Sequence, residues 1–213
     1  ARTEELQQTA NMLDEANKEL QQSYQHTVRA FSNLVSLKGA LSGRYSQKVA
    51  DLARALAKFM KLDERAVTDV YYAGLLHEIG KLSLPDALLG KPPYTLESKD
   101  RSNYQRHPLI GQNALLAVEA LQGTATLIRS QEECFDGSGY PDGIAGTNIP
   151  MGARIVAVAK DYYGYQTGKL LLDIQSNEEA FERIKELGGK RYDPEIVDAF
   201  EELLQRQAAA KQG

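Results

Sequence analysis

The segment Leu75-Leu76-His77-Glu78-Ile79-Gly80-Lys81 decides the fold, because it ends an apolar helical pattern with an imidazole beside a carboxylate. Such a pair presents two metal ligands side by side. A zinc-protease site is excluded, since H-E-x-x-H needs a second histidine at the position that Lys81 occupies. Taken alone, His77 is more often a histidine of the core than a ligand, and that alternative stays open.

Apolar residues around this segment recur at helical spacing. Upstream, a stripe from Val49 through Leu56 to Met60 advances by three or four residues at a time. Asp63 is predicted to be the N-cap of the helix that leads to His77. A polar break at residues 42–44 precedes the stripe that begins at Val49. Further helices are expected near residues 96–106, 109–122, 124–134, 150–166, 177–187 and 194–208. No alternating strand pattern of useful length occurs, so the sequence predicts an all-α fold.

Residues 1–38 form one long helical pattern with a heptad repeat. Its d positions hold Leu6, Leu13, Leu20, Thr27 and Leu34, and its a positions hold Ala10, Asn17, Tyr24 and Phe31. A polar Asn at an a position fixes the register of a coiled coil. We therefore predict a signalling linker in residues 1–38 that forms a homodimer as a parallel coiled coil, followed by one domain in residues 39–213. The alternative is a lone amphipathic helix packed on its own domain.

Composition restricts the classes of partner. The net charge of −4 argues against a nucleic-acid-binding surface, which needs an excess of Lys and Arg. No stretch approaches the length of apolar sequence that a membrane span needs. The single cysteine, Cys134, fits a reducing cytoplasm, where its simplest role is that of a small buried residue. The polar start without Met suggests a piece of a longer protein, with a sensor or receiver domain upstream.

Two further motifs carry candidate chemistry. In Gln105–Gly111, His107 stands directly before Pro108, and proline suits the first position of a helix. In Glu132–Gly143, the run Asp-Gly-Ser-Gly-Tyr-Pro contains Gly139, Tyr140 and Pro141 within a long Gly-rich loop. The order of these motifs along the chain is more specific than any one of them.

Together the motifs resemble the HD-GYP family, a branch of the HD phosphohydrolases, from about Thr27 to Phe200. The resemblance implies a bacterial protein with the helical bundle of the HD superfamily. It also implies two or three metal ions, often iron or manganese, that activate a hydroxide to cleave cyclic di-GMP. The fold expected is therefore an HD-superfamily helical bundle with an N-terminal coiled-coil helix.

Position by position, the resemblance predicts that most metal ligands have been replaced. His77, Glu78 and His107 keep ligand side chains, and Lys81 is a retained, vestigial catalytic residue. The replaced ligand positions are assigned to Tyr45, Ser130, Gln131 and Lys160. We expect no cofactor, or at most a single divalent ion of iron or manganese. We also expect the Lys160 ammonium to occupy the place of a metal and to pair with Glu78, with Asp161 pointing elsewhere, since one residue turns a helix by about 100°.

The segments that would meet nucleotides or partners differ in how much of the family pattern they keep. Where the family has a D-R-P-Y-R run, residues 166–172 keep only Lys169 as a basic residue, and bidentate capture of phosphate by Arg is lost. The loop around Gly139, Tyr140 and Pro141 is nearly complete. It is interpreted either as a packing element or as a docking surface, which the family resemblance links to GGDEF-type signalling proteins.

The predicted function is that of a catalytically degenerate HD-GYP domain of the cyclic di-GMP pathway. It would act in the cytoplasm through protein contacts, for instance as the output domain of a response regulator. One alternative is an active phosphodiesterase that uses a reduced metal site at His77, Glu78 and His107. Another is a receptor that binds cyclic di-GMP without turnover.

Overall fold

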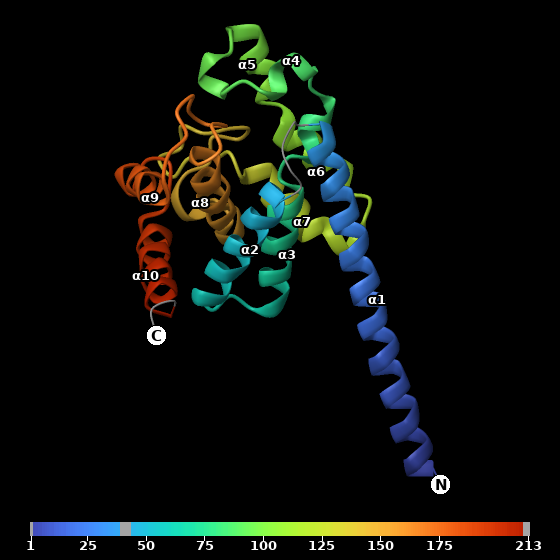
Figure 1. Cartoon of the computed structure of the whole chain (residues 1–213). Helices are drawn as coiled ribbons and strands as arrows, with labels where there is room; N and C mark the ends of the chain where they lie inside the picture. Colours follow the sequence, from blue (N-terminus) through green and yellow to red (C-terminus); the bar gives the residue numbers. More distant parts are fainter. Residues whose placement is uncertain (1, 39–43, 211–213) are drawn as a thin grey trace.

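The computed structural model describes residues 2–38 and 44–210, and these ranges are helical apart from their connecting loops (Figure 1). The long helices are α1 (Arg2–Lys38), α2 (Arg44–Phe59), α3 (Glu64–Leu76), α6 (His107–Leu115), α7 (Gln122–Ser130), α8 (Met151–Tyr165), α9 (Asn177–Glu186) and α10 (Pro194–Ala210). The short ones are η1 (Ile79–Ser83), α4 (Asp86–Leu89), η2 (Pro93–Thr95), α5 (Ser98–Tyr104), η3 (Glu119–Leu121) and η4 (Gly146–Asn148). Within the described ranges there is no β-strand, so the all-α prediction is confirmed. Of the predicted break, Ser42 and Gly43 lie outside the described residues, and α2 begins at Arg44.

The core lies where α2, α3, α7 and α8 meet (Figure 1). Helix α10 packs against α2 and α8. Leu56, Leu75, Ile128 and Phe200 are among its most completely buried side chains. Burial of such side chains contributes about 1.5–3 kcal/mol each. Helices α2 and α3 approach each other closely at Gly74, where an added Cβ would stand 2.6 Å from the Cα of Ala50.

The start of α3 follows the predicted capping chemistry. Asp63 is the N-cap, and its side chain accepts a hydrogen bond of 2.9 Å from the amide of Ala66. This hydrogen bond satisfies one of the backbone amides that have no partner within the first turn, and it fixes where the helix begins. The register of α3 follows from it, and α3 ends at Leu76, immediately before His77 and Glu78.

The two halves of α1 differ in their packing. Its C-terminal half packs on the domain through the buried residues Val28, Ser32 and Val35, and Ser32 donates a hydrogen bond of 2.8 Å to the carbonyl of Leu75. Its N-terminal half extends away from the body of the protein (Figure 1). The predicted single long helix is confirmed, and its second half belongs to the packed domain.

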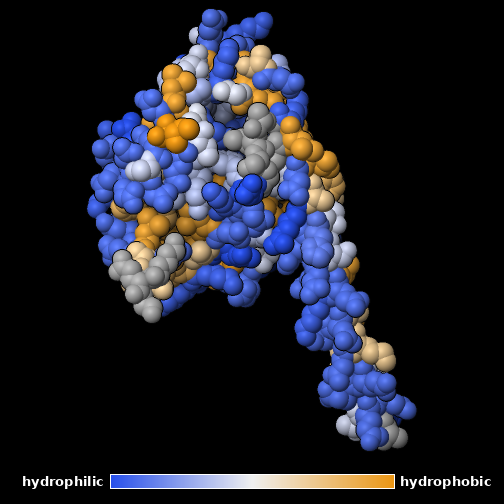
Figure 2. Space-filling view, in the orientation of Figure 1, coloured by the Kyte–Doolittle hydropathy of each residue, from blue (hydrophilic) through white to orange (hydrophobic). Residues whose placement is uncertain are grey.

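The predicted dimer seam of α1 is largely exposed in the single chain. Leu13 and Leu20 are 63% and 69% exposed, and apolar side chains follow the right-hand edge of an otherwise hydrophilic helix in Figure 2. Tyr24, also expected in the seam, instead packs edge-to-face on Tyr72 of α3, with 5.7 Å between ring centroids. Leu6, Leu13, Leu20 and Asn17 remain exposed in the N-terminal half, and Phe31 and Leu34 remain exposed farther along α1.

No helix within residues 2–38 and 44–210 is both long enough and apolar enough to cross a membrane.

Candidate functional site

A cavity of about 600 Å³ lies among the ends of α2, α3 and α8 and the loops after α4, α7 and α8. It brings together most of the candidate residues that are scattered along the sequence. Those that contribute to its wall are Tyr45, His77, Glu78, Lys81, Gly139, Tyr140, Lys160 and Lys169. His107 lies just behind this wall, fully buried, with its ring against Tyr140 at a centroid distance of 6.3 Å.

The two histidines are held in the same way by backbone carbonyls. The Nδ1 atoms of His77 and His107 donate to the carbonyls of Gly74 and Tyr104, both at 2.8 Å, which directs each Nε2 away from the backbone. Burial lowers the pKa of His77 to about 4 and also lowers that of His107. Both rings are therefore neutral near pH 7, the form in which imidazole can accept a hydrogen bond or bind a metal.

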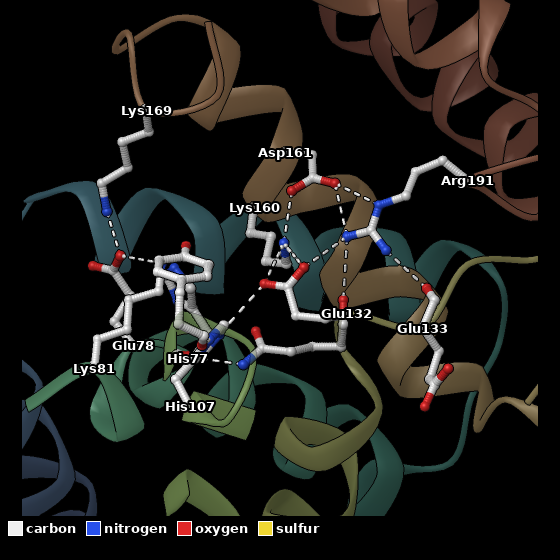
Figure 3. Close-up of polar contacts among 12 residues, drawn as sticks. His77, Glu78, Lys81, His107, Glu132, Glu133, Lys160, Asp161, Lys169 and Arg191 are labelled. Atoms are coloured by element: carbon white, nitrogen blue, oxygen red, sulfur yellow. Dashed lines mark hydrogen bonds and ion pairs between the residues drawn. The ribbon is translucent and has the colours of Figure 1, made fainter. Parts of the chain in front are cut away.

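Glu78 is shared by two lysines. Lys81 lies 3.3 Å from its carboxylate, and Lys169 reaches it from the loop after α8 while lying 4.0 Å above the ring of Tyr45 (Figure 3). Burial alone would raise the pKa of Glu78, but the two ammonium groups lower it below its usual range. Burial, with positive charge nearby on Lys81 and Lys160, lowers the pKa of Lys169 to about 8 despite the contact with Glu78. Lys169, expected to meet nucleotides, is thus the direct partner of a candidate metal ligand.

The predicted partner of Lys160 is wrong. Its ammonium contacts Glu132 at 3.1 Å and Asp161 at 2.7 Å, whereas Glu78 is taken by Lys81 and Lys169 (Figure 3). The expectation that Asp161 points elsewhere is also wrong, because its carboxylate turns toward Lys160 and Arg191 on the cavity wall. A rotation of 100° along α8 does not remove Asp161 from the cavity, since two cations on that side attract it.

Glu132, Asp161, Lys160 and Arg191 form a closed network of two carboxylates and two cations. Arg191 lies 3.1 Å from Glu132 and 3.0 Å from Asp161, so each carboxylate contacts both cations. Burial would raise the pKa of Glu132, but Lys160 and the other nearby cations hold it well below its usual range. Glu132 also reaches His107, with 3.5 Å between Oε1 and Nε2.

Sequence reasoning missed Glu132, Asp161 and Arg191 as residues of the site. The signal for Glu132 was its place four residues before Asp136, where the Asp-Gly-Ser-Gly-Tyr-Pro motif begins. Arg191 follows Gly188-Gly189-Lys190 in a stretch that no motif covers, and it enters the site because the loop before α10 returns to α8.

Ser130 and Gln131, assigned to replaced ligand positions, do not reach the cavity wall. Ser130 is buried at the end of α7, and the Gln131 side chain donates 2.8 Å to the carbonyl of His77. Gln131 therefore fixes the backbone beside His77. Tyr45 does face the cavity, and its hydroxyl donates 3.1 Å to the carbonyl of Lys160.

The loop that contains Gly139, Tyr140 and Pro141, called the GYP loop below, forms part of the cavity wall. The amide of Tyr140 donates 3.2 Å to the carbonyl of Glu132, and Gly139 lies so close to residues 132–134 that a Cβ would stand 2.2 Å from the amide nitrogen of Cys134. The buried Glu133 accepts 2.7 Å from the amide of Asp142. Pro141 follows a cis peptide bond and does not line the cavity. The loop thus packs closely against the segment that carries Glu132.

The side chains present do not fit the metal ions that the family resemblance implies. His77 and His107 offer neutral nitrogens, but the carboxylates of Glu78 and Glu132 are already held by ammonium and guanidinium groups. Across the part of the chain that the structure describes, no three His, Cys, Asp or Glu side chains are grouped to hold a metal. The same positions that would supply acidic ligands instead complete ion pairs within the protein.

Comparisons with known proteins agree with this fold and motif order. A family model described as an HD domain matches residues 29–196. A cyclic di-GMP phosphodiesterase from Thermotoga maritima is 35% identical over 75% of this chain and 44% of its own length. A probable cyclic di-GMP phosphodiesterase from Vibrio cholerae is 30% identical over 85% of this chain and 45% of its own length. The chain thus spans about half the length of the curated relatives it matches.

The solved structures show the same helical fold. The crystal structure of a cyclic GMP-AMP-specific phosphodiesterase of V. cholerae aligns with a TM-score of 0.67 at 19% identity, over 84% of this chain and 48% of the other. An HDG"Y"P protein from Bdellovibrio bacteriovorus aligns with a TM-score of 0.63 at 20% identity, over 76% of this chain and 51% of the other. On the family match and this shared architecture, the chain belongs to the HD-domain family.

Proposed function

We propose that this HD domain is a non-hydrolytic signalling module of a cyclic di-GMP pathway, a degenerate HD-GYP domain that acts through protein contacts. The observation that carries the proposal is the position of Lys160, whose ammonium is held on the cavity wall between Glu132 and Asp161. Two positive charges about 4 Å apart, one of them double, repel by roughly 8 kcal/mol at an effective dielectric constant near 20. A divalent ion bound beside Glu132 would either displace the Lys160 ammonium or be bound more weakly because of that repulsion.

The first test is metal content and turnover of the purified chain. We expect no stoichiometric iron or manganese by elemental analysis, and no linear product from cyclic di-GMP when either metal is added. The Thermotoga maritima relative, assayed in parallel, is the positive control for the conditions. Hydrolysis that disappears on adding a chelator would contradict the proposal and would support a phosphodiesterase with a reduced metal site.

The proposed protein contact begins with a second copy of the chain along α1. Two observations support this contact: the leucines at the d positions are exposed, and Asn17 occupies an a position, as in parallel two-stranded coiled coils. In such a dimer the two domains would lie side by side. A GGDEF-type signalling protein, implied by the family resemblance, is a further candidate partner.

Charge placed in this seam is expected to separate the dimer. In sedimentation experiments we expect the unmodified chain to be a dimer, and the double variant Leu13→Glu, Leu20→Glu to be a monomer, because charges at d positions cannot be buried in the seam. Gln22→Glu, at the outer f position, is the matched control and should stay dimeric. Identical sedimentation of all three proteins would show that α1 does not pair in this way.

A second candidate function, binding of a nucleotide without turnover, is favoured by the cavity itself. Its volume of about 600 Å³ lies within the usual range for small-molecule sites. Lysine and tyrosine side chains line it, which suits phosphates and aromatic bases. The two functions are compatible, since a bound ligand can regulate a protein contact.

A further inference from the structure

The cavity has more positive than negative side chains. Its cationic side chains are Lys81, Lys91, Lys160, Lys169, Arg183 and Arg191, and its carboxylates are Glu78, Glu132 and Asp161. A concave site with uncompensated positive charge concentrates anions.

Four of the nine charged side chains on the cavity wall balance one another. Lys160 and Arg191 are matched by Glu132 and Asp161 in the closed network described above. Arg183 has its own partner, Glu186, at 2.9 Å. These groups leave no positive charge to be neutralised by a ligand.

The excess lies on the side of the cavity that contains Glu78. Lys81 and Lys169 share this single carboxylate, so the three side chains together keep one positive charge. Lys91 is exposed at the cavity wall, and none of the described residues forms an ion pair with it. Leu89, two residues before Lys91, lines a smaller hollow together with Glu78, Lys81 and Lys169, which places the α4 loop beside these lysines. This side therefore carries two uncompensated positive charges.

Two neighbouring positive charges match a phosphate monoester better than a phosphate diester. A monoester carries a charge of about −1.5 to −2 near pH 7, whereas each phosphate of a cyclic dinucleotide carries only one. Lysines bind phosphate as point charges and need no fixed fork geometry. Tyr94, 54% exposed on the same loop as Lys91, and Tyr104 beside Lys81 offer aromatic faces on which a base can stack.

We infer that the cavity takes a nucleotide with a terminal phosphate monoester, held by Lys81, Lys91 and Lys169, in preference to a cyclic phosphodiester. The inference deepens the proposed function and rests on it, because it treats the cavity as a binding site without turnover. The domain would then respond to the linear products that phosphodiesterases release. Its ligand class is a mononucleotide or linear dinucleotide with a free 5′-phosphate.

Calorimetric titration of the whole chain tests this preference with four probes: linear diguanylate with a 5′-phosphate, 5′-GMP, cyclic di-GMP and guanosine. We expect linear diguanylate to bind roughly tenfold or more tightly than cyclic di-GMP, since one additional charge-assisted contact to phosphate is worth at least that factor. We expect 5′-GMP to bind and guanosine, which lacks phosphate, to give no heat of binding. The inference would be overturned if cyclic di-GMP bound as tightly as linear diguanylate or more tightly. It would also be overturned if neither linear diguanylate nor 5′-GMP bound.

Variants separate a phosphate contact from a loss of structure. Lys91→Met is on an exposed loop and should fold normally, and we expect it to weaken binding of linear diguanylate roughly tenfold. Lys169→Met should act in the same direction. Lys58→Met, an exposed lysine at the end of α2, is the control and should bind like the unmodified chain. If Lys91→Met and Lys58→Met bind alike, the assignment of Lys91 is wrong.

The same samples distinguish this inference from the proposed function. Chromatography of the cyclic di-GMP recovered after titration reports turnover independently of affinity. Recovered linear product would contradict the non-hydrolytic proposal. Intact cyclic di-GMP together with tighter binding of the cyclic form would contradict only the preference for a monoester.

Discussion

Replacing Lys160 by Met is expected to lower the free energy of unfolding by about 3–5 kcal/mol, because it leaves two buried carboxylates with one cation in place of two. Lys160 is 6% exposed, and its ammonium contacts both Glu132 and Asp161. After the substitution only Arg191 remains to balance the two negative charges of this network. Urea denaturation followed by circular dichroism at neutral pH measures the change.

A second substitution tests whether charge imbalance is the cause. In Lys160→Met, Glu132→Gln the network loses one charge of each sign, so we expect the double variant to recover part of the lost stability. Lys58→Met controls for loss of a lysine at an exposed site and should stay within about 0.5 kcal/mol of the unmodified chain. If Lys160→Met also stays within that range, the ammonium is not the structural counter-ion of Glu132 and Asp161.

The fold could be predicted because its determinants are local in the sequence. The spacing of apolar residues predicted the long helices, and Asp63 predicted where α3 begins. Such signals act within one or two helical turns and survive in a single sequence. The family resemblance added the helical architecture, which the match over residues 29–196 and the structural alignments confirm.

The candidate site could be predicted only in part, because its ion pairs join distant segments. His77, Glu78 and Lys160 were identified from motifs, but the partner of Lys160 depends on where α7, α8 and the loop before α10 meet. Glu78 and Lys169 are separated by 91 positions in the chain. Periodicity carries no information about such pairings, so the charge network emerged only from the three-dimensional arrangement.

We expect Gly139→Ala to lower the free energy of unfolding by about 3 kcal/mol, at the upper end of the cost of overpacking. The added Cβ would stand 2.2 Å from the amide nitrogen of Cys134 and 2.6 Å from the carbonyl oxygen of Glu132. Both are backbone atoms, so neither can rotate away as a flexible side chain could. Urea denaturation of the variant measures the cost.

Gly90→Ala is the matched control for Gly139→Ala. No heavy atom lies within 4 Å of a Cβ built at Gly90, and its φ of −93° suits alanine. We expect a change of less than about 0.5 kcal/mol at Gly90, so a large difference between the variants isolates the steric contact of Gly139 from the general effect of replacing glycine. Because the displaced backbone carries Glu132, Gly139→Ala should also loosen the Lys160 network. Adding Gly139→Ala to Lys160→Met should then cost less than the sum of the two changes, whereas strict additivity would show that the loop packs without positioning Glu132.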